Sequence, residues 1–200
     1  MVFTSLEFFA FLPLALLIFA AFPVQRRWIG LLLASYFFYS FTQPINLLYL
    51  GAVTVVVYAS GRAIAAAEPG PWRKALFSAG LTIILGSLVA FKFFDFIAGE
   101  LSRLVAQIVG GNSFAIPRLG LSTPVGYSFY AFSAASYLID IYMAKLPKAT
   151  RAADVALYVA WFPKILSGPI ERATTFLPQL WQGLRANPER LVWGSDWPHP

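Results

Sequence analysis

The sequence predicts an all-α protein whose helices cross a membrane several times as a multispanning bundle. Of its 200 residues, 58% are hydrophobic and only 12% are charged, whereas a soluble domain carries about 25% charged residues. Apolar runs of membrane-spanning length recur along the chain. The net charge of +6 lies mainly between these runs, which is typical of charges that orient loops rather than of a nucleic-acid surface. A soluble α protein with a very apolar core is the alternative.

Five apolar segments are expected to span the membrane. The first apolar segment is not preceded by a basic region, and no small-residue cleavage pattern lies before Arg26. We therefore expect a retained helix rather than a cleaved signal peptide. The second is short and ends before Pro44, which cannot continue a helix without losing a hydrogen bond. It is therefore expected to be re-entrant or tightly paired with the third. The expected spans are residues 8–24, 28–41, 45–60, 75–91 and 119–142.

Residues 96–109 have a different pattern, typical of an amphipathic helix. Apolar residues recur on one helical face, while Glu100 and Arg103 lie on another. Such a helix is expected to lie in the membrane interface; a solvated connector helix is the alternative. The apolar-face residues are Ile97, Leu101, Leu104, Val105 and Ile108.

A last apolar stretch, residues 152–170, is interrupted by Pro163, Lys164, Gly168 and Pro169. We expect a broken or partly inserted helix here. Irregular backbone at membrane depth is tolerated only where protein or a cavity surrounds it.

The basic residues predict the orientation of the spans. With the N-terminus outside, the inner loops hold eight basic residues and the outer loops hold three. The positive-inside rule therefore favours an external N-terminus. The inner residues are Arg26, Arg27, Arg62, Arg73, Lys74, Lys145, Lys148 and Arg151, and the outer ones are Lys92, Arg103 and Arg118.

Two polar signatures lie inside hydrophobic sequence. The first reads Pro-Val-Gly-Tyr-Ser-Phe-Tyr over residues 124–130 and continues as Ser-Tyr-Leu-Ile-Asp over 136–140. The second reads Trp-Phe-Pro-Lys over 161–164 and Ser-Gly-Pro-Ile-Glu-Arg over 167–172. Hydroxyls and charges at membrane depth are costly unless they face protein or a water-filled path. These residues therefore mark an internal surface.

Together with Leu-Leu-Leu-Ala-Ser-Tyr-Phe-Phe-Tyr at 31–39 and Phe-Lys-Phe-Phe-Asp-Phe at 91–96, these signatures resemble the membrane-bound O-acyltransferases. The resemblance is greatest to the branch that O-acetylates alginate, and it extends to about residue 180. It implies that residues 1–180 form the N-terminal half of an enzyme in the bacterial inner (plasma) membrane. That enzyme would transfer an acyl group to an extracytoplasmic polysaccharide.

The resemblance also implies partners. The acyl donor is expected as a substrate, with no bound cofactor. Membrane lipid, a polysaccharide acceptor and extracytoplasmic acetylation proteins are the expected partners, and nucleic acid is not one. The alternative is a non-catalytic membrane scaffold that docks partners of a polysaccharide modification or export complex. A small transporter built around the broken 163–169 segment is disfavoured because no internal repeat supports it.

The family's key histidine lies in a later span, whereas the single histidine here is His199. We therefore expect a truncated chain that is inactive alone and contains no catalytic residue. Residues 181–200 resemble a fragment of metal-dependent amidohydrolases and are expected to be an unrelated tail, a fusion or frame artefact. Asp196 and His199 alone do not predict a metal site, because such a site needs three or four ligands.

Five residues are candidates to line a substrate tunnel. Tyr127, Tyr130 and Tyr137 share one helical face and are expected either to line a polar path or to join helices by hydrogen bonds. Asp140 is expected to shape the cytoplasmic mouth of the path or to pair with loop cations. Lys164 is expected to hold an anionic donor or to extend to lipid phosphate.

Overall fold

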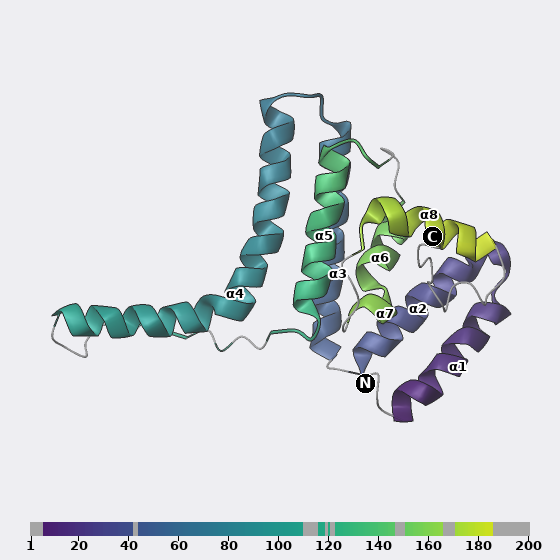
Figure 1. The fold of residues 1–200 in the computed structure, drawn as a ribbon, viewed down its shortest axis with the longest axis horizontal. Coiled ribbons are helices and arrows are strands. Elements are labelled where there is room, and N and C mark those ends of the chain that lie inside the picture. The colour runs from purple at the N-terminus through teal and green to yellow at the C-terminus, as the bar shows by residue number, and fades with distance from the viewer. Residues whose placement is uncertain are drawn as a thin grey trace, which may run out of the picture.

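The computed structural model describes residues 6–41, 44–109, 116–118, 120, 123–146, 151–165 and 171–185. Every regular element in these ranges is a helix, which confirms the predicted all-α class (Figure 1). The elements are α1 (Leu6–Ala21), the 3₁₀ turn η1 (Val24–Arg26), α2 (Arg27–Ser40), α3 (Pro44–Ala66), α4 (Pro71–Val109), α5 (Tyr127–Tyr142), α6 (Ala152–Ala160), α7 (Phe162–Ile165) and α8 (Ala173–Arg185).

Helices α3 and α4 run antiparallel as a hairpin, whereas α3 and α5 run parallel, and Arg73 bonds carbonyls near the C-terminal ends of both (Figure 1). The α3–α4 hairpin stands beside α5, while α6, α7 and α8 fill the space between α5 and the α1–α2 pair (Figure 1). Both long helices begin at a proline, Pro44 and Pro71. Proline suits the first helical turn because its missing N–H has no partner there in any helix. The expected break at Pro44 is therefore the start of α3.

The lengths of the spans differ in part from those expected. The stretches Pro44–Ala66 and Pro71–Ile108 are long and apolar enough to cross a membrane. Helices α1, α2 and α5 have only 16, 14 and 16 residues, fewer than the roughly 20 of a full crossing.

The expected single span over residues 119–142 was wrong at its beginning. Helix α5 starts at Tyr127, because Gly126 has a left-handed φ of 73°. A left-handed residue cannot continue a right-handed helix. The residues described between 116 and 126 belong to the loop that leads into α5.

The fourth span and the amphipathic segment form one 39-residue helix, α4, and not two. The helix bends sharply, so that its C-terminal part leaves the bundle (Figure 1). We call residues 96–109 the arm. The expected break in the 152–170 stretch occurs at Trp161, between α6 and α7, and residues 166–170 lie outside the described ranges.

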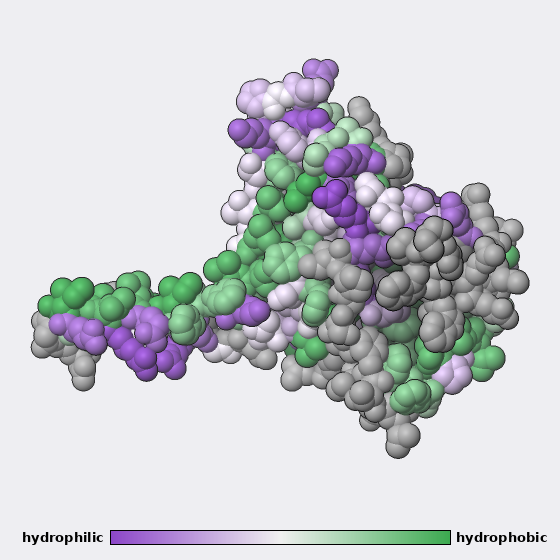
Figure 2. Space-filling model, in the orientation of Figure 1, coloured by the Kyte–Doolittle hydropathy of each residue, from purple (hydrophilic) through white to green (hydrophobic). Residues whose placement is uncertain are grey.

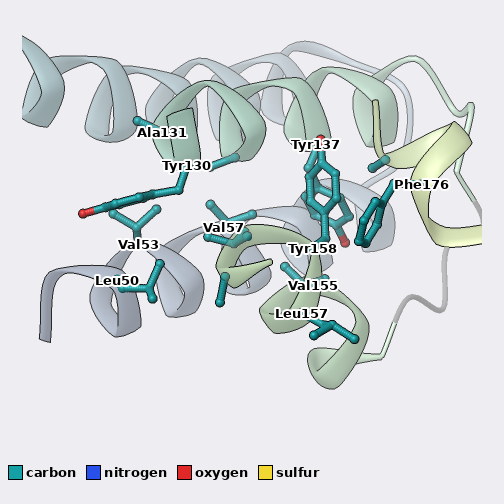
Figure 3. Close-up of a cluster of buried hydrophobic side chains, with 14 of the residues drawn as sticks. Leu50, Val53, Val57, Tyr130, Ala131, Tyr137, Val155, Leu157, Tyr158 and Phe176 are labelled. Atoms are coloured by element: carbon teal, nitrogen blue, oxygen red, sulfur yellow. The ribbon is translucent and has the colours of Figure 1, made fainter. Parts of the chain in front are cut away.

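The core lies between α3, α5, α6 and α8. Figure 3 shows its side chains converging from these helices, including Leu50, Val57, Tyr137, Tyr158 and Phe176. Small residues allow the helices to approach closely, as is common between membrane helices. A Cβ added at Gly61 of α3 would lie 2.7 Å from the Tyr137 ring of α5.

Candidate functional site

The two polar signatures meet at Gly126. A Cβ on this residue would overlap the carbonyl oxygen of Ile165, the last residue of α7. The neighbouring carbonyl of Val125 accepts a 2.6 Å hydrogen bond from the Tyr39 hydroxyl of α2. The beginning of α5 is therefore held by segments that are distant in the sequence.

A tyrosine cluster lies at this beginning of α5, formed by Tyr39, Tyr127 and Tyr130. The rings of Tyr127 and Tyr130 meet edge to face at 5.0 Å, and those of Tyr39 and Tyr130 at 6.2 Å. The Tyr127 hydroxyl donates to the Ser87 hydroxyl at 2.6 Å, which donates to the Ile84 carbonyl. All three tyrosines are buried. Their polar groups thus connect α2, α4 and α5.

Tyr137 belongs to a second group, further along α5. It lies seven residues after Tyr130, which places it about 10 Å along the helix axis. Its ring is 6.5 Å from that of Tyr158 in α6, and the Tyr158 hydroxyl donates to the Glu171 carbonyl at 2.7 Å. The three predicted tyrosines therefore divide between two buried groups.

Lys164 lies inside this second group. Its Nζ donates to the Tyr158 carbonyl at 2.9 Å and lies 3.8 Å from the Tyr158 ring centroid and 5.2 Å from that of Phe176. The residue is only 5% exposed, so extension to lipid phosphate was the wrong expectation. One carbonyl and two aromatic faces replace part of the water that a buried ammonium group loses.

Asp140 is also buried, at 1% exposure. Within the described part of the chain, neither of its carboxylate oxygens has a hydrogen-bond partner. Arg151, one of the loop cations expected to pair with it, instead bonds Asp154 at 3.4 Å. Lys148 lies outside the described residues. A buried carboxylate in this state is an exception that requires an explanation.

Arg73 joins three helices at one end of the bundle. Its guanidinium donates to the carbonyls of Tyr142 at 2.9 Å and of Ile141 and Ile64 at 3.3 Å. These carbonyls lie near the C-terminal ends of α3 and α5, where carbonyls often lack an intrahelical donor; that of Ile141 also accepts from the Ala144 N–H at 3.0 Å. Arg73, one of the basic residues that predict the orientation of the spans, thus also joins α3, α4 and α5.

Ser35 belongs to the candidate site but was not predicted from the sequence. Its hydroxyl donates to the Leu31 carbonyl and accepts a 3.4 Å hydrogen bond from the Phe162 N–H at the start of α7. Ser35 and Tyr39 are four residues apart in a largely apolar helix, so they share a face. That spacing was the available signal for a polar face on α2.

In the described ranges, no group of three or more His, Cys, Asp or Glu side chains could hold a metal ion. Asp196 and His199 lie outside those ranges. The expected domain boundary at residue 180 falls within α8. Trp181 packs against the core, with the Arg151 guanidinium 4.1 Å from its ring centroid, so this residue belongs to the helical fold.

The chain is similar to bacterial O-acetyltransferases. It is 34% identical to the probable alginate O-acetylase AlgI of Azotobacter vinelandii, over 90% of this chain and 36% of that protein. The probable alginate O-acetylase AlgI of Pseudomonas aeruginosa is also 34% identical, over 90% of this chain and 34% of its own length. A peptidoglycan O-acetyltransferase of Helicobacter pylori is 27% identical, over 88% and 38%.

The chain thus spans about a third of the length of the curated relatives it matches. No protein-family model and no solved structure matches it.

Proposed function

We propose that the chain forms the N-terminal membrane portion of a membrane-bound O-acyltransferase that acetylates an extracytoplasmic polysaccharide such as alginate. The observation that carries the proposal is the 34% identity to probable alginate O-acetylases over 90% of the chain. The buried polar groups support it, because they lie on the helices that carry the two polar signatures. Alginate is one acceptor among those named for the relatives, and peptidoglycan is another.

In this proposal, α5 and α7 contribute one wall of the path followed by the acyl group. Tyr127 and Tyr130 line it at the Gly126 end of α5. Tyr137, Lys164 and Asp140 line it nearer the opposite end. Ionisable groups inside a membrane protein are usually retained for such paths, and the burial of Lys164 and Asp140 fits this role.

We further propose that the N-terminus lies outside the bacterial inner membrane. The start of α4 and the C-terminal end of α5 lie at the same end of the bundle (Figure 1). Arg73 and Lys74 are in the first turn of α4, and Lys145 and Arg151 lie between α5 and α6. Basic loops favour the cytoplasmic side. Asp140 then lies toward the cytoplasm and the tyrosine cluster toward the outside.

Deleting the whole gene for the proposed enzyme, of which this chain forms one portion, in its source bacterium tests the function. We expect the exopolysaccharide to be made in normal amount but without base-labile acetate, and the intact gene should restore the acetate. Loss of the polysaccharide itself would favour the scaffold alternative. Unchanged acetate would contradict the proposal.

Variants in the restored gene test the proposed path. Asp140→Asn and Tyr130→Phe should each lower the acetate content without lowering the amount of membrane protein. Tyr142→Phe is the matched control, because the Tyr142 ring stacks on Phe77 at 4.4 Å and keeps that contact without its hydroxyl. Equal acetate in all three strains would remove these residues from the path.

The 200-residue chain by itself should be inactive. Only about a third of the relatives' length aligns with it, and its single histidine is His199. The purified chain, given an acetyl donor and alginate, should release no more ester-linked acetate than a heat-treated sample. Turnover that survives His199→Ala would contradict this expectation.

A further inference from the structure

The arm leaves one apolar stripe uncovered. Ile97, Leu101, Leu104 and Ile108 are 45–83% exposed, and their spacing places them along one side of the helix. Figure 2 shows this hydrophobic side as a continuous surface along the projecting arm. A stripe of this kind on a projecting helix requires a partner.

The opposite side of the arm is already occupied by the chain itself. The Ser102 hydroxyl accepts a 2.9 Å hydrogen bond from the Ile116 N–H, and the Asp95 carboxylate accepts one from the Gly120 N–H at 3.0 Å. The guanidinium of Arg118 lies against Gly99, where an added Cβ would be 3.2 Å from it. On the flank, Glu100 and Arg103 form an exposed ion pair at 2.9 Å.

The direction of the stripe indicates which partner fits. The apolar side faces the direction in which the α3–α4 hairpin rises, and the polar side faces away from it (Figure 2). If the hairpin stands along the membrane normal, the arm lies nearly in the membrane plane, with its stripe toward the hydrocarbon. A helix that docked on another protein would not need to lie across the spans with its apolar stripe facing their direction.

The length of α4 before the arm agrees with that placement. Residues 75–91 carry no charge and extend over about 25 Å at about 1.5 Å per residue, close to a hydrocarbon core of about 30 Å. Arg73 and Lys74 precede this stretch, and Lys92 and Asp95 follow it. The bend into the arm therefore lies where the charged boundary of the membrane is expected.

We propose that the arm lies in the membrane interface, with its stripe in the acyl-chain boundary, and fixes the depth of the loop that leads into α5. The Thr123 hydroxyl ties this loop to the Phe91 carbonyl at 2.9 Å, and the loop ends at Gly126 beside the tyrosine cluster. The arm thereby holds that cluster at one membrane surface. The proposed orientation, with the N-terminus outside, places the arm in the outer leaflet. The depth of the arm in the membrane does not depend on that orientation.

Spin labels on single cysteines test the depth, because the chain has no cysteine of its own. The full chain carrying Leu104→Cys or Ile108→Cys is placed in nanodiscs of phosphatidylethanolamine and phosphatidylglycerol. Both labels should collide more with oxygen than with a water-soluble nickel chelate, and should lie roughly 5–10 Å below the phosphate level. Gln107→Cys, at an exposed position on the polar flank, is the matched control and should show the reverse preference.

Two results would overturn the proposal. Labels at Leu104→Cys and Ile108→Cys that collide freely with the nickel chelate would show a solvated arm. Labels that are immobile and shielded from both reagents would show that protein, such as a second copy of the chain, covers the stripe.

The leaflet is tested separately with a membrane-impermeant maleimide on Gln107→Cys. Labelling is expected in right-side-out vesicles. Labelling only in inside-out vesicles would overturn both the leaflet assignment and the proposed orientation, and would leave the depth result standing.

Discussion

Asp140 and Asp154 are both buried, yet their surroundings differ. Arg151 lies 3.4 Å from the Asp154 carboxylate, whereas the Asp140 oxygens have no hydrogen-bond partner among the described residues. A charge that is buried without compensation destabilises a fold. A buried carboxylate that destabilises the fold is expected to have a functional role, and we infer that Asp140 lines the proposed acyl path.

Asp140→Asn should therefore stabilise the detergent-solubilised chain. The substitution nearly keeps the shape and removes the cost of a buried charge without a partner, so we expect a higher free energy of unfolding. The thermal midpoint, followed by size-exclusion chromatography, measures it. Asp154→Asn is the control and should lower the midpoint because it breaks an ion pair. A similar loss in both variants would mean that Asp140 has a partner outside the described residues.

Gly126→Ala should be strongly destabilising, for two reasons. The φ of 73° is unfavourable for alanine by roughly 1–2 kcal/mol, and the new Cβ would overlap the Ile165 carbonyl oxygen. We expect a lower thermal midpoint and a smaller monodisperse fraction. Gly86→Ala is the control, since a Cβ there meets no atom within 4 Å. Equal behaviour of the two variants would contradict the described contact between α5 and α7.

At the scale of elements, much of the helix pattern could be predicted from apolar runs and prolines. The start of α3 at Pro44 and the break between α6 and α7 follow from local chemistry. The unbroken passage of α4 into the arm was not expected, although residues 92–95 contain neither glycine nor proline to end a helix. The amphipathic pattern changed there, but a change of pattern bends or reorients a helix without necessarily ending it.

The contacts of the candidate site were beyond sequence reasoning for a different reason. Tyr39 meets Val125 and Ser35 meets Phe162, pairs that are 86 and 127 residues apart. Local periodicity places residues on a face of one helix and says nothing about which other helix lies opposite. The shared face of Tyr127, Tyr130 and Tyr137 could be predicted, whereas their division between two groups depends on the positions of α2 and α6.

The contact between α3 and α5 gives the prediction at this scale. Gly61→Ala should force the two helices apart, because its Cβ would lie 2.7 Å from the Tyr137 ring and overpacking costs about 1–3 kcal/mol. The thermal midpoint should fall. Gly51→Ala in the same helix meets no atom within 4 Å and should be neutral or slightly stabilising. Adding Tyr137→Leu to Gly61→Ala should recover part of the loss, and no recovery would place the strain elsewhere.

At the scale of the whole molecule, the helical fold combines uncovered apolar surface with a buried polar interior. Exposed apolar residues such as Phe9, Leu48 and Val55 lie on α1 and α3, as expected for helices in lipid. Polar contacts join α2 to α7, and α6 to the residues that precede α8. In lipid, close packing and internal hydrogen bonds replace the hydrophobic effect as the forces that hold helices together. A segment therefore belongs to the fold if its side chains pack in that buried interior.

Helix α8 marks how far the fold extends. Phe176 and Leu180 are buried in the core, and the Arg151 guanidinium lies 4.1 Å from the Trp181 ring centroid. Ending the chain after Arg185 keeps all of these contacts, so its thermal midpoint in detergent should match that of the full chain. Ending it after Gln179 removes Leu180 and Trp181, and burial of one large apolar side chain contributes about 1.5–3 kcal/mol.

The midpoint of the shorter chain should therefore fall. The variant Trp181→Ala in the full chain separates the loss of this side chain from the loss of the helix end, and it should show a smaller decrease. If ending the chain after Arg185 lowers the midpoint as much as ending it after Gln179, residues 186–200 contribute to the membrane fold and are not an independent tail. If neither truncation changes the midpoint, the contact between Arg151 and Trp181 does not stabilise the bundle.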